Sequence, residues 1–332
     1  MTKVGILKDW TYLKLFRQSP SGKGVWEDVQ FLEDPTVTCD YIIVLNKPGK
    51  DTVVCCPKSN IWSIMLEPPN EIYGWMHRGD INSARVYTTD PRLQGERYRQ
   101  GQPALYWLVQ KDYDFLSSCP PPEKERSLSW ITSNRTINRG HRLRMKFLDK
   151  LQRQMKLDLY GVGFNYIKDK WHGLAPYRYS LAIENFSNAL YWSEKICDCF
   201  LAWTMPIYYG CTQINDFFPA EAMIRIDIRD PLCIEQIRQA VLSDAWKRSR
   251  EAIAYARQQI LNHHQFFPFI VREIRDYEAK IIETENLPQE VLLSSEIRTQ
   301  LDKHEVMRRF WRKNTPAKLR SKIARIRYKF ER

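Results

Sequence analysis

Hydrophobic and polar positions follow two periods along the chain, and together they predict an α/β protein. Runs rich in β-branched and aromatic residues predict a first set of strands at 4–7, 41–45, 62–66, 85–88 and 104–109. A second set is predicted at 129–132, 157–161, 177–183, 205–209 and 223–228. Residues 142–155 carry apolar side chains at helical spacing, which predicts an amphipathic helix within the second set. Strands that alternate with helices favour parallel sheets.

A run of three prolines at 120–122, followed by charged residues, interrupts the strand pattern and is typical of a linker. We therefore predict two Rossmann-like domains that face a central cleft. The first covers residues 1–120 and the second covers 121–285. Residues 286–332 are predicted to form a helical, basic C-terminal tail.

The segment 177–210 combines a strand, a loop, a helix and a second strand. Ser193 is a favourable N-cap, and Glu194 suits the first turn of the helix. Because the loop 184–192 runs from the end of a parallel strand to a helix N-terminus, it lies where open α/β sheets bind ligands. Free N–H groups at a helix N-terminus favour anionic phosphates, and Lys195 adds a full positive charge there. This arrangement predicts a diphosphate ligand.

Several motifs in this region resemble the signature of glycosyltransferase family 10, the α-1,3/4-fucosyltransferases. They are Ala-Ile-Glu-Asn at 182–185, Tyr-Trp-Ser-Glu-Lys at 191–195 and Met-Pro-Ile-Tyr-Tyr-Gly at 205–210. Trp-Ile-Thr-Ser-Asn at 130–134 and Glu-Pro-Pro at 67–69 follow the same family order. The resemblance implies a GT-B fold, with an N-terminal acceptor domain, a C-terminal donor domain and catalysis in the cleft. It also implies GDP-fucose as donor, a GlcNAc/Gal-containing glycan as acceptor, an α-1,3 or α-1,4 linkage and inversion at the anomeric carbon.

The resemblance also assigns roles to individual residues. The family's donor-binding positions match Arg144, Asn185, Tyr191, Glu194 and Lys195, with Arg142 and Arg139 as runners-up to Arg144. Glu194 would hold the ribose hydroxyls and Lys195 the diphosphate. Glu67 matches the family's general base, which accepts a proton from the acceptor hydroxyl. Without the resemblance, Asn185 reads equally as a turn residue, Tyr191 as core and Glu194 as a first-turn acid.

Phe186 and Trp192 stand where smaller or β-branched residues are usual in the family, and Ser193 replaces the commoner threonine. We therefore expect the first two to bear on the shape of the donor pocket, and another GDP-linked sugar is the alternative donor. The pair Asp112 and Asp114 matches a D-x-D metal motif, but we interpret it as coincidental because it lies outside the donor block. No catalytic metal is expected. Arg144, Lys195 and helix N–H groups would instead stabilise the departing GDP.

Charge is concentrated at one end of the chain. Residues 308–332 hold eleven Lys or Arg and one acid, which is +10 of the total net charge of +12. Apolar residues at helical spacing among these charges predict a peripheral anchor on an anionic membrane. With no signal peptide or apolar run of spanning length, we expect a cytoplasmic protein. A nucleic-acid-binding protein is the alternative that the basic tail suggests, but it leaves 177–210 unexplained, so no nucleic-acid partner is expected. Whether the chain forms a homodimer is left open.

Overall fold

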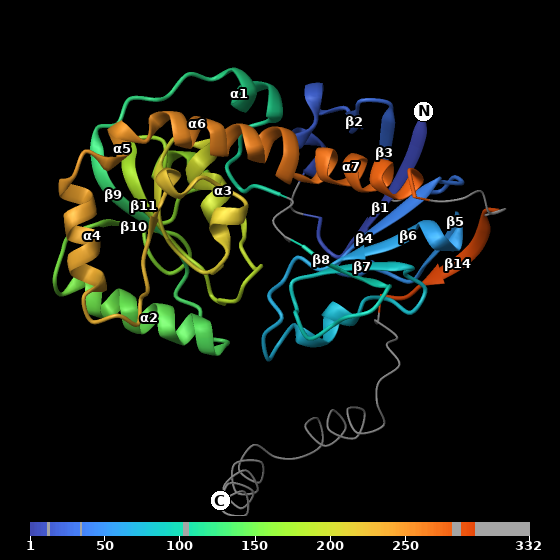
Figure 1. The fold of residues 1–332 in the computed structure, drawn as a ribbon, viewed down its shortest axis with the longest axis horizontal. Helices are drawn as coiled ribbons and strands as arrows, with labels where there is room; N and C mark the ends of the chain where they lie inside the picture. The colour runs from blue at the N-terminus through green and yellow to red at the C-terminus, as the bar shows by residue number, and fades with distance from the viewer. Residues whose placement is uncertain (12–13, 34, 102–105, 281–286, 296–332) are drawn as a thin grey trace, which may run out of the picture.

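A computed structural model describes residues 1–295 of this chain, except 12–13, 34, 102–105 and 281–286. Two α/β units lie side by side, each built on a mainly parallel sheet (Figure 1). The strands of the first unit are β1 (Thr2–Lys8), β2 (Val25–Trp26), β3 (Val29–Glu33), β4 (Tyr41–Leu45), β5 (Thr52–Cys56), β6 (Ile61–Ile64), β7 (Arg85–Thr88) and β8 (Tyr98–Gln100). The predicted GT-B architecture of two such units is confirmed. None of the helices in the described part of the chain is long and apolar enough to cross a membrane.

The sheet of the first unit has the order β2-β3-β1-β4-β6-β7-β8 and is parallel except at the β2–β3 pair. Its central strands are apolar on both faces; all five residues of β4 are buried. Such continuous apolar runs are expected where a sheet is covered on both sides. The short 3₁₀ helices of this unit are Leu15–Gln18, Pro20–Gly22, Lys58–Asn60 and Gly74–Arg78.

The second unit has a five-stranded parallel sheet in the order β10-β9-β11-β12-β13. Its elements are α1 (Tyr113–Ser118), β9 (Arg126–Ile131), α2 (Arg139–Gln152), β10 (Asp158–Tyr160), β11 (Tyr177–Ile183), α3 (Glu194–Leu201), β12 (Met205–Tyr209), β13 (Ile224–Arg225), α4 (Cys233–Leu242), α5 (Ala245–Arg248) and α6 (Arg250–Gln259). Three 3₁₀ helices, Lys170–Gly173, Ile214–Asp216 and Ala220–Ala222, join them. The strand–loop–helix–strand reading of 177–210 is confirmed by β11, α3 and β12.

The chain returns to the first unit after α6, which corrects the predicted boundary at residue 285. A π-helical turn (Ile260–His264) leads into α7 (Phe266–Glu278), which runs along the first sheet (Figure 1). Phe266, Phe267 and Ile270 of α7 are fully buried in the core of the first unit. Strand β14 (Gln289–Leu293) then pairs antiparallel with β5, so the predicted helical tail begins with a strand. Its remaining residues, 296–332, lie outside the described residues.

The first crossing between the units also differs from the prediction. Residues 106–109 belong to no strand, whereas 104–109 was predicted as one, and Trp107 and Val109 are buried in the core of the second unit. The backbone of 106–109 is held by hydrogen bonds to side chains and not by pairing with a neighbouring strand. Gln18 Oε1 accepts a hydrogen bond from the Trp107 backbone N–H at 3.0 Å. The chain has therefore crossed before the prolines at 120–122, which only join α1 to β9.

Candidate active site

The loop that links β11 to α3 is fixed at both ends by one buried acid. Glu184, at the end of β11, accepts hydrogen bonds from the Ser193 N–H at 2.9 Å and from its hydroxyl at 2.7 Å. Ser193 is the N-cap of α3, as predicted, because its hydroxyl accepts from the Lys195 N–H. Asn188 ties the loop to the first unit, since its Nδ2 donates to the Thr89 carbonyl at 2.7 Å. The N-terminus of α3 is thereby held against the gap between the units.

A cavity of about 630 Å³ occupies this gap. Its volume is typical of sites for molecules of drug or cofactor size. The first unit and the crossing segment contribute Leu66, Glu67, Tyr106 and Leu108, and the second unit supplies the rest of the wall. All six residues that the sequence nominated for catalysis and donor binding line this cavity: Glu67, Arg144, Asn185, Tyr191, Glu194 and Lys195.

The wall of the cavity carries an excess of positive charge. Its cations are Arg135, Arg144, Lys168, Lys170 and Lys195, against the two acids Glu67 and Glu194. His141 also lines the cavity, but burial, with help from nearby Arg144, lowers its pKa to about 4. It is therefore neutral near pH 7. An excess of cations around a partly enclosed space favours an anionic ligand.

Glu194 is held as a carboxylate at the cavity wall. Burial acts to raise its pKa, but the ammonium groups of Lys195 and Lys170 outweigh burial and bring that pKa to about 2. Its Oε1 lies 3.3 Å from Lys170 Nζ and 3.7 Å from Lys195 Nζ. An ionised carboxylate has several acceptor positions and can take two hydroxyl donors at once, as a ribose diol requires.

Lys195 lies between two acids. Its Nζ is 3.1 Å from Glu184 Oε2 and donates to the Ser193 hydroxyl at 3.0 Å. Burial acts to lower the pKa of Lys195, but Glu184 and Glu194 raise it above its usual value. The ammonium group therefore keeps its charge. About a fifth of the side chain (22%) remains exposed, so the charge can reach an anion in the cavity.

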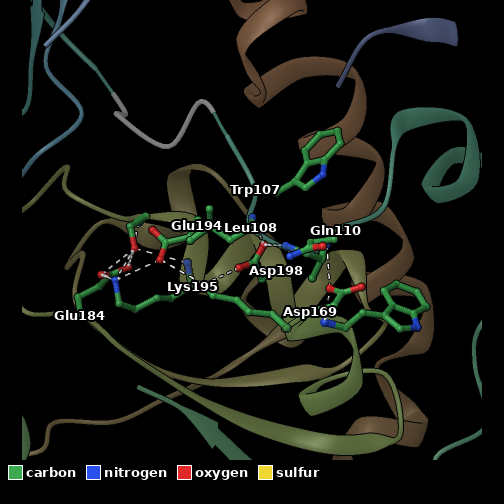
Figure 2. A network of polar contacts seen from close by, with 12 residues as sticks. Trp107, Leu108, Gln110, Asp169, Glu184, Glu194, Lys195 and Asp198 are labelled. Carbon is green, nitrogen blue, oxygen red and sulfur yellow. Dashed lines mark hydrogen bonds and ion pairs between the residues drawn. The ribbon is translucent and has the colours of Figure 1, made fainter. Parts of the chain in front are cut away.

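Lys170 and Asp198 extend this network to the crossing between the units, and Figure 2 shows Asp198 beside Leu108. Lys170 Nζ lies 2.8 Å from Asp198 Oδ2 and also contacts Glu194. The other oxygen of Asp198 accepts from the backbone N–H groups of Leu108 and Val109 at 2.8 and 3.2 Å. Glu194 is thus connected, through one lysine and one buried aspartate, to the chain segment that joins the units.

Arg144 and its neighbours present polar atoms that have no partner among the described residues. Arg144 is 3% exposed, and Nη2 makes a long contact of 3.4 Å with Ser133 Oγ. Four buried atoms of Arg144 and other residues that line the cavity lack a hydrogen bond within the described part of the chain: Thr132 Oγ1, His141 Nδ1, Arg144 Nε and Asn185 Oδ1. Buried polar groups are normally paired, so a cluster of unpaired ones indicates a polar ligand.

Asn185 occupies a close contact between two elements. Its Nδ2 lies 3.1 Å from His141 Nε2 on α2. Gly140 lies against the Asn185 carbonyl, where a Cβ on residue 140 would collide with it. Only glycine permits this approach of α2 to the loop.

The aromatic residues of the loop divide between the cavity and the core. Tyr191 is 4% exposed, lines the cavity and packs edge-on against Phe186. Trp192 faces away from the cavity and packs against Phe217 and Phe218. Trp192 therefore fills the core of the second unit and does not line the cavity, which corrects the expectation from the sequence.

Glu67 approaches the cavity from the first unit. It follows β6 and precedes Pro68, as the sequence predicts for a strand end in a stiff turn. Burial raises the pKa of its carboxyl, and the nearby negative charge of Glu194 raises it further. A carboxylate with a raised pKa is a better proton acceptor near neutral pH.

Comparison with known proteins agrees with this arrangement. Residues 121–231 match the family described as glycosyltransferase family 10 (fucosyltransferase) C-term. The chain is similar to the 4-galactosyl-N-acetylglucosaminide 3-alpha-L-fucosyltransferase 9 of Rattus norvegicus, with 30% identity over 132 residues that cover 36% of this chain and 35% of that protein. The protein of the same name from Homo sapiens gives the same identity and coverage.

The matched stretch holds five of the six nominated residues, and Glu67 lies outside it. The chain spans about a third of the length of the curated relatives it matches (35%). Among solved structures, it is similar to an alpha1,3-fucosyltransferase with GDP-fucose, at 16% identity and a TM-score of 0.45 over 80% of this chain and 92% of that chain. A second structure of an alpha1,3-fucosyltransferase gives 17% identity and a TM-score of 0.47, over 80% of this chain and 91% of that chain.

Two other sets of nominated residues lie away from the cavity. Arg142 donates to the Thr136 and Ile137 carbonyls, and neither it nor Arg139 lines the cavity, so of the three nominated arginines only Arg144 does. Asp112 is the N-cap of α1, where it accepts from the Phe115 N–H at 2.8 Å. Asp114 accepts from the Ser21 N–H at 2.9 Å. Asp112 therefore caps a helix, and Asp114 holds α1 to the segment around Ser21.

Three residues of the polar network around Glu194 and Lys195 were missed from the sequence as functional positions. Glu184 stood within the recognised motif, and its burial beside a lysine was not predictable from its position. Asp198 lies four residues after Glu194 on α3 and is the one charged residue among 196–201, so it was an available signal. Lys170 offered no signal, because its two acidic partners lie 24 and 28 residues further along the chain.

Proposed function

We propose that this protein is an inverting fucosyltransferase, which transfers fucose from GDP-fucose to a hydroxyl of a GlcNAc/Gal-containing glycan. One observation carries the proposal. A carboxylate with a raised pKa, Glu67, enters from the first unit into the same cavity in which the second unit gathers Arg144, Glu194 and Lys195. A base on one wall and an anion-binding set on the other is the arrangement that transfer from a nucleotide sugar requires.

The donor is assigned to the second unit. The diphosphate would be bound by Lys195 and Arg144, at the positive end of the α3 helix dipole. Glu194, ionised at neutral pH, would accept hydrogen bonds from the ribose hydroxyls. Asn185 and Tyr191 would complete this wall. These roles match the unpaired polar atoms and the positive charge of the cavity.

Glu67 would act on the acceptor. As the acceptor oxygen attacks the anomeric carbon of fucose, its proton passes to the Glu67 carboxylate. The bond between that carbon and the phosphate oxygen breaks, and GDP leaves with the bonding electrons. The transition state resembles an oxocarbenium ion, as in other glycosyl chemistry. Attack from the face opposite the departing GDP inverts the configuration at the anomeric carbon.

Negative charge on the leaving GDP would be stabilised by Lys195 and Arg144. Both groups are already in place before the reaction, so they need no reorganisation as charge develops. We propose that this pair, with the helix N–H groups, takes the part that a divalent cation has in metal-dependent transferases.

The acceptor class follows from the relatives. Their printed name, 4-galactosyl-N-acetylglucosaminide 3-alpha-L-fucosyltransferase, specifies a galactosyl-N-acetylglucosaminide acceptor and a 3-alpha linkage for those proteins. For this chain we propose an acceptor that contains the same two sugars, with an α-1,3 or α-1,4 linkage.

The test is a transfer assay with GDP-fucose and a panel of Gal- and GlcNAc-containing acceptors, run beside GDP-mannose and UDP-galactose. Fucosylated product from GDP-fucose alone, with an inverted anomeric configuration by NMR, supports the proposal. Transfer from another GDP-sugar, or product of retained configuration, would contradict the donor or the mechanism. The paired variant is Glu67→Gln, which should bind GDP normally and fail to turn over.

A further inference from the structure

The segment around Glu67 is held by side chains on both sides. The Leu66 N–H donates to Asn46 Oδ1 at 2.9 Å, and the Glu67 carbonyl oxygen lies 2.8 Å from His77 Nε2. Pro68 follows, with its φ fixed by the ring. No hydrogen bond to the Glu67 carboxylate occurs within the described part of the chain, so its position depends on how the backbone beneath it is held.

The geometry leaves His77 one neutral tautomer. A carbonyl oxygen can only accept, so Nε2 must carry the proton that it donates to Glu67. Nδ1 of the neutral ring is then an acceptor, and the Thr88 hydroxyl, 2.6 Å away, donates to it. Thr88 Oγ1 in turn accepts from the Asp90 N–H at 3.0 Å. A directed chain of hydrogen bonds therefore runs from the end of β7 to the backbone of Glu67.

This chain lies in a dry part of the first unit. His77 is 0% exposed and Thr88 is 1% exposed. Burial lowers the pKa of His77 to about 4, so the ring stays neutral and its two hydrogen bonds persist at neutral pH. Hydrogen bonds shielded from water compete with no solvent and define a position well.

The turn beyond Glu67 is also fixed. Asn70 Oδ1 accepts from the backbone N–H groups of Ile72 and Tyr73 at 2.9 and 3.0 Å, and the Asn70 N–H donates to the Pro68 carbonyl. The 3₁₀ helix that carries His77 begins at Gly74, directly after this turn. His77 therefore closes the loop on itself, because it bonds back to the residue from which the loop departs.

We infer that His77 is a positioning residue for Glu67: it acts through the Glu67 carbonyl to fix where the carboxylate stands in the cavity, and it does not touch the substrate. The inference rests on the proposed role of Glu67 as general base. A base must lie within hydrogen-bond reach of the proton that it removes. Release of the Glu67 backbone should therefore slow the chemical step and leave donor binding unchanged, since the donor-binding residues belong to the second unit.

Two substitutions of His77, whose new side chains differ in length, test this positioning role. The amide nitrogen of His77→Gln can occupy the place of Nε2 and donate to the Glu67 carbonyl, whereas the shorter side chain of His77→Asn cannot. We expect His77→Asn to lower kcat on the order of 10²-fold, the cost of misplacing a reacting group by about 1 Å. GDP affinity, measured by calorimetry, should stay at the wild-type value. His77→Gln should recover most of the lost kcat, and His263→Asn, on an exposed histidine, is the matched control.

Melting temperatures of all variants separate positioning from folding. A folded His77→Asn protein with wild-type kcat overturns the inference, as does equal loss of kcat in His77→Asn and His77→Gln at equal stability. If His77→Asn does not fold, Thr88→Val interrupts the same chain one step away, and a wild-type kcat in that variant also overturns the inference. Glu67→Gln is measured in parallel. A wild-type rate there refutes the general base itself, whereas a lost rate beside an active His77→Asn refutes only the positioning role.

Discussion

Lys195 offers the most informative single substitution, because its ammonium group has two separate roles. It faces the cavity as a cation for the diphosphate, and it neutralises Glu184, whose side chain is fully buried. Lys195→Met removes the charge and keeps most of the apolar stem. The two consequences, weaker GDP binding and lower stability, can be separated because they depend on different partners.

The expected magnitudes follow from the contacts. A hydrogen bond to a charged group contributes about 1.5–3 kcal/mol, so loss of the diphosphate contact should raise the Kd for GDP by about 10- to 150-fold. Glu184 loses an ammonium partner at 3.1 Å and keeps the N–H and hydroxyl of Ser193. A buried group left short of one partner costs about 1–3 kcal/mol, so the free energy of unfolding should fall by a similar amount.

The double variant Lys195→Met with Glu184→Gln tells these effects apart. It removes both charges, so the free energy of unfolding should return toward the wild-type value while GDP binding remains weak. Calorimetry with GDP and denaturant unfolding measure the two quantities. An unchanged Kd in the folded single variant would refute the phosphate assignment. A double variant that regains wild-type affinity would show that the loss came from the uncompensated Glu184 charge.

Four further outcomes are expected. General-base catalysis needs the ionised carboxylate, so kcat/KM should fall as pH falls through the Glu67 pKa, which burial and Glu194 raise above the ordinary value. The Glu67→Gln variant should lose kcat by about 10²–10⁴-fold, and a nearly wild-type rate would refute the role of Glu67. Arg144→Ala should weaken GDP binding severely and Arg142→Ala, its exposed neighbour, only slightly; equal Kd values would contradict this. Transfer should continue in excess EDTA, and a complete loss restored by manganese would overturn the metal-free proposal. Removal of residues 308–332, which lie outside the described residues, should abolish binding to anionic vesicles while transfer to a short soluble acceptor continues; a truncated protein that unfolds or loses GDP binding would instead place the segment in the folded body.

The sequence by itself determined those features that depend on near neighbours in the chain. The bounds of β4, β7, β11 and β12 agree with the strand pattern, because buried strands are rich in β-branched, aromatic and other apolar residues. Ser193 was identified as a cap since capping involves residues two or three positions apart. The six nominated residues all line one cavity, although five of them were found through a family motif and could have been read as local structure without it.

Only the tertiary structure decided which distant residues share a wall. The path of α7 back to the first unit could not be predicted, because its apolar face would suit either core. Lys170 and Asp198 lie beside Glu194, and His77 lies against the Glu67 carbonyl, because separate elements pack together there. The local pattern specifies that a side chain is apolar, charged or capped. The partner that neutralises it, or the carbonyl that it holds, is fixed by the packing of segments far apart along the chain.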